Sequence, residues 1–268
     1  MKRFVHSLLP LLLILTACGT TYELPALTEV ENQQARSIFA QAQQNPARPQ
    51  ISQAAAEGRF TRVSSRIAKV GNQYCKTLTE GRGVNCNVDI AINYKMKQRN
   101  AYFTYNKQQP IIRISLPMLQ DTKSDDEVAF ILGHEYGHLI GGHIEKKTQQ
   151  AVVGSLILGT LTAAASSHGA SYDAQAVHDS FQLGAQLGSR AYSQEYELES
   201  DILGTRIASA AGYDAVKGAH FFARSEATRT KDGQLSFWGT HPPDAKRLAI
   251  VIATQRQIDA NVGLQISD

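Results

Sequence analysis

The chain has 268 residues, with 27 Lys and Arg against 24 Asp and Glu and a formal net charge of +3. Two of the basic residues lie in the first 17 positions, so the remainder carries 25 basic and 24 acidic residues, a net charge of +1. This near balance gives no indication of a nucleic acid or a strongly acidic partner. The length is enough for one sizeable domain with a substantial core.

The N-terminal stretch MKRFVHSLLPLLLILTAC predicts export. Two basic residues precede an apolar segment, residues 4–15, that is too short to span a bilayer and is followed by small residues. LTAC resembles a bacterial lipobox, in which Cys18 becomes the lipidated first residue; an ordinary secretory signal with a chance cysteine is the alternative. Gly19 resembles the sorting signal for the outer membrane. We therefore predict a signal peptide over 1–17 and a lipid anchor on the periplasmic face of the outer membrane.

The next segment, residues 18–50, is predicted to be a tether that continues into a polar helix and ends at NPARPQ. A single folded domain is expected over 51–268. It begins with a helix over 52–80, in which apolar residues recur at helical spacing.

Two cysteines remain once Cys18 is lipidated. Cys75 and Cys86 are eleven positions apart and flank TLTEGRGVN, which has the composition of a loop. In an exported protein a disulfide is the natural interpretation, and two free thiols are the alternative. Neither cysteine has the spacing of a metal ligand.

Three short segments predict a small antiparallel sheet. VDIAINY, residues 88–94, alternates apolar and polar side chains, and AYFTY (101–105) and IIRISL (111–116) are also typical of strands, joined through NKQQP. With the helices around it, this sheet indicates an α+β domain that is mostly helical.

The stretch SDDEVAFIL, residues 124–132, predicts the start of a helix. Ser124 and Glu127 form a capping box, and the aspartates of the first turn suit the helix dipole. The helix is expected to end near 141–142, where two glycines occur together. Glycines recur every four residues along it: Gly133, Gly137 and Gly141. They leave a smooth stripe where another backbone could approach closely.

This helix contains HEYGH. His134 and His138 are four residues apart and share a helix face, so both imidazoles can point at one ion. Glu135 lies about 100° round the helix and can reach a metal-bound water without being a ligand. Two exposed histidines on an amphipathic helix are the alternative. His143 lies about 140° from His138 and is expected to have a structural role.

The stretch AVVGSLILGTLTAAA, residues 151–165, is nearly all apolar or small. Because fifteen residues are short for a bilayer span, we expect a buried helix; contact with a membrane or an apolar client, or an integral membrane protease, are alternatives. A loop is expected over 166–175, helices over 176–211 and 212–227, and a loop over 230–243 before a closing helix.

A catalytic zinc site needs a third protein ligand and one position for water. Candidates lie in EYELESD, residues 195–201. Glu197 and Asp201 share one helix face, and Glu195 and Glu199 share another. Helical spacing alone does not choose between these pairs.

HEYGH, the later E-x-x-x-D and the final H-P-x-x-x-x-R together resemble the M48 family of zinc metallopeptidases, the group of HtpX-like and Ste24-like proteases, and most closely its periplasmic lipoprotein members. The resemblance spans about residues 88–250. It implies a zincin-like fold and one Zn²⁺ per chain, held by His134, His138 and Glu197. It also implies that Asp201 orients a zinc-binding histidine.

The last motif lies in THPPDAKR. By the resemblance, His241 either occupies the water position or helps bind the tetrahedral intermediate, and a plain surface histidine is the alternative. Arg247 is either an oxyanion partner or a structural ion-pair residue. Glu135 is the expected base that deprotonates the water.

The resemblance implies a zinc endopeptidase that cleaves unfolded or misassembled envelope proteins. The substrate is expected to dock as an added strand beside residues 100–116. The alternative is a zinc-stabilised chaperone or assembly factor that binds envelope clients with little proteolysis.

Overall fold

The computed structural model describes residues 19–44, 50–167, 193–224, 231, 233 and 236–267. The predicted signal peptide, the lipidation site Cys18, most of the loop expected over 166–175 and the first part of the helix expected over 176–211 lie outside these residues.

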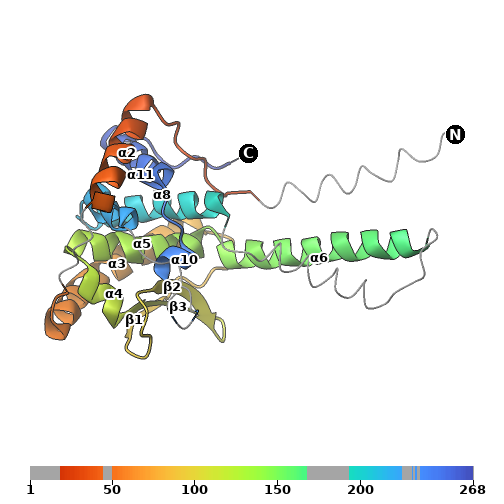
Figure 1. Ribbon diagram of the computed structural model, residues 1–268, viewed down its shortest axis with the longest axis horizontal. Coiled ribbons are helices and arrows are strands. Elements are labelled where there is room, and N and C mark those ends of the chain that lie inside the picture. The colour runs from red at the N-terminus through yellow and green to blue at the C-terminus, as the bar shows by residue number, and fades with distance from the viewer. Residues whose placement is uncertain are drawn as a thin grey trace.

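The α+β class is confirmed, because most of the described chain is helical and three strands form one small sheet (Figure 1). The strands are β1 (Asp89–Asn93), β2 (Ala101–Asn106) and β3 (Gln109–Ser115). The helices are α2 (Glu29–Gln44), α3 (Gln53–Leu78), α4 (Leu116–Asp121), α5 (Asp125–Ile140), α6 (His143–Ser167), α8 (Gln194–Ala210), α9 (Ala215–Ala219), the 3-10 turn η2 (His220–Ala223), α10 (Phe237–Thr240) and α11 (Ala245–Asp259).

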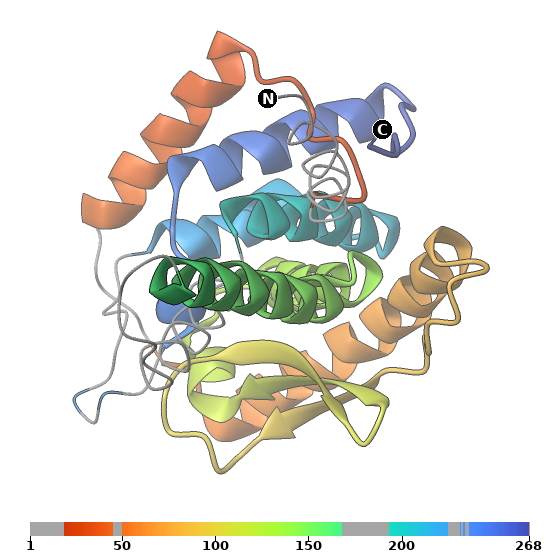
Figure 2. The ribbon, with the colours of Figure 1, turned by 90° about the vertical axis from the view of Figure 1, so that its right-hand side faces the viewer.

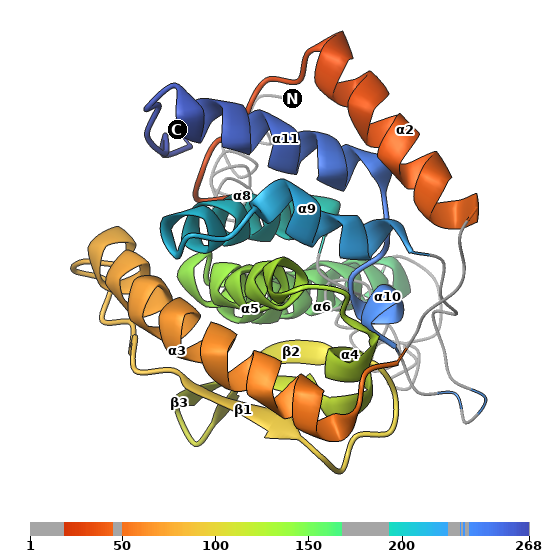
Figure 3. The ribbon, with the colours of Figure 1, turned by 90° about the vertical axis from the view of Figure 1, so that its left-hand side faces the viewer.

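The helices lie in layers over the sheet. Figure 3 shows α11 above α8 and α9, these above α5, and α3 with the sheet below. Helix α5 is central, and every residue from Glu127 to Ile140 is buried. It therefore cannot be the amphipathic helix with exposed histidines that was the alternative for HEYGH.

The sheet is mixed, and the prediction of a purely antiparallel sheet is wrong for β1. The strand order is β1-β3-β2, with β2 antiparallel to β3 and β1 parallel to β3. Strands β1 and β2 run in opposite directions, but they do not pair with each other. Strand β3 lies between them, antiparallel to β2 and therefore parallel to β1. The hairpin turn at Lys107 and Gln108 has positive φ at both residues (47° and 71°), as a two-residue turn with the right twist requires. Strand β2 is left at an edge of the sheet.

Helix α5 begins with one half of the predicted capping box. The Ser124 hydroxyl accepts a hydrogen bond from the Glu127 N–H at 3.3 Å. The Glu127 carboxylate does not complete the capping box on Ser124; it accepts from the Lys123 N–H at 2.6 Å and forms an ion pair with Arg224. The ion pair thus ties the start of α5 to Arg224, the residue that follows η2.

Helix α6 runs out from the body of the protein in Figure 1, and Figure 2 looks along it. The expectation of a buried helix over 151–165 is wrong at its start, because Val152 and Leu156 are each 52% exposed. Among the described helices, none is long and apolar enough to cross a membrane.

The two ends of the described chain meet. Residues Tyr22 and Ile266 form a β-bridge, and the Glu23 N–H donates to the Gln265 carbonyl at 3.0 Å. The sulfur atoms of Cys75, near the end of α3, and Cys86, before β1, are joined in a disulfide.

Candidate active site

Helices α5 and α8 approach so closely that their backbones touch. A Cβ on Gly204 would lie 2.8 Å from the backbone nitrogen of His134, and a Cβ on Gly137 would lie 2.7 Å from the Cα of Ser200. At Gly133 and Gly137 the glycine stripe thus receives another backbone, as the sequence predicts, whereas a Cβ on Gly141 would meet the side chain of His143. This contact holds the histidines of α5 opposite the acidic residues of α8.

Four buried side chains converge at this contact: His134, His138, Glu197 and His241. Their candidate ligand atoms lie within 4.8 Å of one another. The two histidine Nε2 atoms of α5 are 3.1 Å apart, and Glu197 oxygens lie 3.4 and 3.6 Å from them. His241 Nδ1 lies 3.3 Å from His134 Nε2 and 2.9 Å from Glu197 Oε2.

These separations fit a tetrahedral zinc site. With bonds of 2.0–2.1 Å, ligand atoms at the corners of a tetrahedron lie about 3.3 Å apart. Three imidazole nitrogens and one carboxylate are also the donor types that Zn²⁺ prefers. Of the two pairs that helical spacing left open on α8, the one containing Glu197 faces the cluster.

Asp201 and Arg247 lie behind His134. Asp201 Oδ1 lies 2.9 Å from His134 Nδ1, so the carboxylate can hold the proton on Nδ1 and leave Nε2 free to face the cluster. The guanidinium of Arg247 donates to both oxygens of Asp201 at 2.7 Å and lies 3.2 Å from Glu197 Oε2. Because the guanidinium of Arg247 is already paired with both carboxylates, the geometry favours its structural ion-pair role over the oxyanion role.

His138 has a different support. Its Nδ1 lies 2.9 Å from His143 Nδ1, and His143 Nε2 lies 2.7 Å from Glu199 Oε2. His143 thus stands behind the cluster and not in it, in keeping with its expected structural role. Glu199, the carboxylate on the other face of α8, meets His143 instead of the candidate metal ligands.

Glu135 points into the same cluster. It is 1% exposed, and within the described chain neither of its oxygens has a partner at hydrogen-bonding geometry. His241 Nε2 is 3.6 Å from its Oε1. A buried carboxylate without a hydrogen bond requires a reason, and a metal-bound water is the partner that this donor set implies.

Comparison with known proteins agrees with this geometry. Residues 80–254 match the family model of peptidase family M48. The chain belongs to peptidase family M48. The metalloprotease LoiP of Escherichia coli (strain K12) is 29% identical to it over 187 residues, which cover 68% of this chain and 70% of LoiP. The family resemblance of the sequence is therefore confirmed, and the protein is a metallopeptidase.

The charges of this M48 site favour a cation. Burial acts to raise the pKa of the Glu197 carboxyl, but His241, Arg247 and His134 hold that pKa well below its usual range. Burial acts to lower the pKa of His134, but Asp201 and Glu197 raise it to about 9. A metal ion must therefore displace a proton from His134, so metal binding should weaken in acid.

His241 reaches the M48 cluster from a short helical turn. Its backbone N–H donates to the Phe237 carbonyl at 2.7 Å at the end of α10, within the segment that was expected to be a loop. The side chain is buried, so the alternative of a surface histidine is wrong. Of its two expected roles, the position of Nδ1 among the ligand atoms favours occupation of the fourth site.

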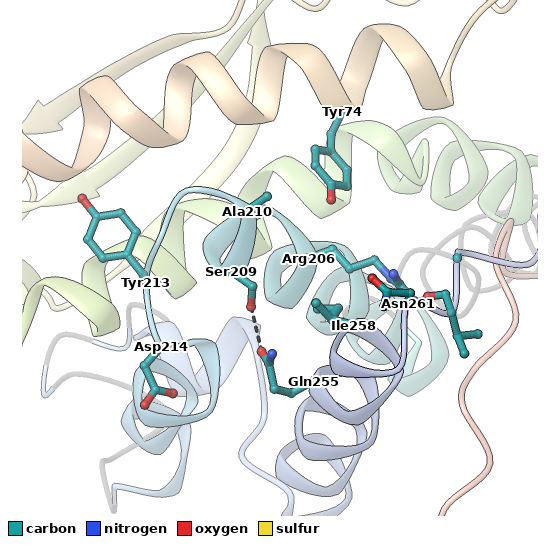
Figure 4. A pocket seen from close by; sticks show the side chains of 11 residues that line it. Tyr74, Arg206, Ser209, Ala210, Tyr213, Asp214, Gln255, Ile258 and Asn261 are labelled. Atoms are coloured by element: carbon teal, nitrogen blue, oxygen red, sulfur yellow. Dashed lines mark hydrogen bonds between the residues drawn. The ribbon is translucent and has the colours of Figure 1, made fainter.

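The four candidate ligands line neither of two hollows of the described fold, which measure about 680 and 890 Å³. A cavity of about 680 Å³ lies at the far ends of α8 and α11, where Tyr74, Arg206 and Gln255 line it (Figure 4). None of the four candidate ligands lines this cavity. In this M48 peptidase, donor chemistry locates the site and cavity size does not.

Proposed function

We propose that this M48 metallopeptidase is a zinc-dependent endopeptidase of the bacterial envelope. The observation that carries the proposal is a buried carboxylate, Glu135, directed without a hydrogen bond at a cluster of three imidazoles and the Glu197 carboxylate. Zn²⁺ held by three of these groups, with the fourth position open, would lower the pKa of a coordinated water to about 7.

Glu135 is the base in this proposal. Burial raises the pKa of its carboxyl, while His241 and His134 act to lower that pKa. A pKa above the usual carboxyl range suits a group that takes a proton from the attacking water and returns it to the leaving amine. Asp201 and Arg247 keep His134 in position from behind.

His241 sets a condition on catalysis. A catalytic zinc site keeps one position open, whereas His241 Nδ1 lies 2.9 Å from the ligand oxygen of Glu197 and completes the donor set. We infer that the histidine must withdraw before water and substrate can bind. The resting enzyme would then have low activity, which leaves room for the alternative function, a chaperone or assembly factor that rarely cleaves its clients.

The edge strand β2 is the proposed docking site for an extended substrate. Within the described chain β2 pairs only with β3. The backbone N–H of Phe103 on β2 approaches the Glu135 carboxyl and acts to lower its pKa, but it does not reach hydrogen-bonding geometry with either oxygen, so the strand lies beside the proposed base. A cavity of about 890 Å³ opens near the hairpin turn, lined among others by Tyr105 and Leu139. A peptide added to this edge would pass the base in extended form. Unfolded chains expose such strands, which supports unfolded or misassembled envelope proteins as substrates.

The lipid anchor at Cys18 and the periplasmic face of the outer membrane complete the proposal. They are supported by the lipobox-like LTAC and by Gly19 after it.

Digestion of casein or an unfolded envelope protein by the wild type and by Glu135→Gln tests the proposed activity. Loss of digestion in the variant, with protection of clients from aggregation retained, supports the peptidase. Equal rates for the two proteins would eliminate it. Metal content by mass spectrometry for the wild type and Glu197→Ala tests the third ligand, because the variant should lose bound zinc.

A further inference from the structure

The N-terminal segment of the described chain contacts the acidic residue behind the metal cluster. The backbone N–H groups of Thr21 and Tyr22 both donate to Glu199 Oε1, at 2.5 and 2.8 Å. Glu199 is fully buried, and Tyr22 is 2% exposed. Two main-chain donors therefore fix one oxygen of a carboxylate that lies 177 residues away in sequence from the nearer of them.

The other oxygen of Glu199 leads to a candidate metal ligand. Glu199 Oε2 lies 2.7 Å from His143 Nε2, and His143 Nδ1 lies 2.9 Å from His138 Nδ1. A carboxylate only accepts hydrogen bonds, so His143 donates from Nε2 and accepts at Nδ1. His138 then carries its hydrogen on Nδ1, and the lone pair of its Nε2 faces the cluster. This is the tautomer that a metal ion needs.

We propose that residues 19–23, here called the N-terminal strap, position His138 for metal binding through Glu199 and His143. This inference rests on the proposed zinc site. The strap positions the ligand by fixing Glu199, because a carboxylate without those two donors could turn away from His143. His138 would then lose the partner that sets its ring orientation and its tautomer.

The strap is itself held at several points. The Thr21 carbonyl accepts from the Ser267 N–H at 3.0 Å, and the Tyr22 hydroxyl donates to the Leu78 carbonyl at 3.2 Å. Lys146, near the start of α6, donates to the Thr21 hydroxyl at 2.8 Å and lies 3.8 Å from Glu199 Oε2. These contacts come from three different parts of the fold, so the strap is placed by tertiary structure.

The other histidine of HEYGH does not depend on the strap. His134 is supported by Asp201 on α8 and, through it, by Arg247 on α11. Loss of the strap should therefore weaken metal binding by loosening one ligand while the other stays fixed. Removal of a partner behind a metal ligand typically weakens metal affinity about 10- to 100-fold.

The zinc dissociation constant of the full chain, measured by competition with a chromophoric chelator, tests the proposal. Thr21→Pro removes one main-chain donor, and Thr21→Ala is its matched control, because alanine keeps the N–H to Glu199 and loses only the hydroxyl that Lys146 contacts. We expect the proline variant to bind zinc roughly tenfold more weakly than the wild type, and the alanine variant within about threefold. Glu199→Gln places an amide where Glu199 accepts three hydrogen bonds. We expect this variant to bind zinc about 10- to 100-fold more weakly than the wild type.

The visible absorption of the Co²⁺-substituted chain gives a second readout, since it reports the ligand geometry. We expect the spectrum to change in Thr21→Pro and Glu199→Gln and to be unaltered in Thr21→Ala. The melting temperature of each metal-free variant shows that it is folded, and Glu199→Gln carries the test if the proline variant does not fold. If the wild type binds zinc and Thr21→Pro and Glu199→Gln bind it equally well, the proposed role of the strap is overturned and the proposed function stands. A wild type that binds no zinc would overturn both.

Discussion

The close contact between α5 and α8 makes Gly204→Ala a test of how the site is held together. The added Cβ would lie 2.8 Å from the His134 nitrogen and 3.0 Å from its Cα, both backbone atoms that cannot turn away. Ordinary contacts of carbon are about 3.5 Å or longer, so the helices must separate by roughly 0.5 Å or more. Metal–ligand distances tolerate only about 0.2 Å, and α8 carries Glu197 while α5 carries both histidines.

Two opposing terms set the expected magnitude. Overpacking costs about 1–3 kcal/mol, and the better helix propensity of alanine returns up to about 1 kcal/mol. We therefore expect the free energy of unfolding to fall by about 1 kcal/mol and the melting temperature by about 2–4 °C. The same strain acts on the bound ion, so we expect the zinc dissociation constant to rise about tenfold, which corresponds to about 1.4 kcal/mol.

Gly58→Ala in α3 is the matched control, because its Cβ would meet only the end of Arg62 at an ordinary 3.7 Å. This variant should melt at or above the wild-type temperature and bind zinc normally. The measurements are differential scanning fluorimetry and chelator competition on the three proteins. If Gly204→Ala gains stability as the control does and keeps its zinc affinity within twofold, the helix contact does not hold the ligands in place.

Four further outcomes are expected. Glu135→Gln should digest an unfolded protein at least about 100-fold more slowly than the wild type while keeping its zinc, and loss of zinc instead would make Glu135 a ligand and not the base. Replacing Cys75 and Cys86 by serine should lower the free energy of unfolding by about 3 kcal/mol, the loop-closure value for eleven residues, and an unchanged urea midpoint would contradict this. Chelation should lower the melting temperature and abolish digestion, both restored by added Zn²⁺; a chain equally stable without metal would speak against a metal bound only by the folded state. Cys18→Ala should appear in the soluble fraction after cell breakage, whereas a variant that stays with the membranes would favour contact through α6.

Those parts of the site that are local in the chain are predictable from the sequence. His134 and His138 are one helical turn apart, so the geometry of any helix places them on one face. The Ser124 cap is also a local interaction, because the hydroxyl bonds an N–H three residues on. The glycines of α5 predict a close approach by another backbone, although the sequence does not say which backbone it is.

The choice between Glu197 and Glu199 required the tertiary structure. The two carboxylates are two residues apart and point to opposite sides of α8. Only the packing of α8 on α5 decides that Glu197 faces the histidine pair while Glu199 faces His143 and the N-terminal strap. Spacing within α8 is the same whichever side is buried, so the motif resemblance was needed to name Glu197 from the sequence.

Contacts between distant segments were also invisible in the sequence. Thr21 meets Glu199 across 178 positions, and β3 inserts between β1 and β2, because burial of apolar surface selects one arrangement of the whole chain from many that satisfy each local pattern. The sequence by itself determined the helix that carries HEYGH, and its motifs indicated the protein family. Tertiary structure decided which acidic group completes the donor set, what holds each histidine, and that His241 comes close enough to occupy the fourth position.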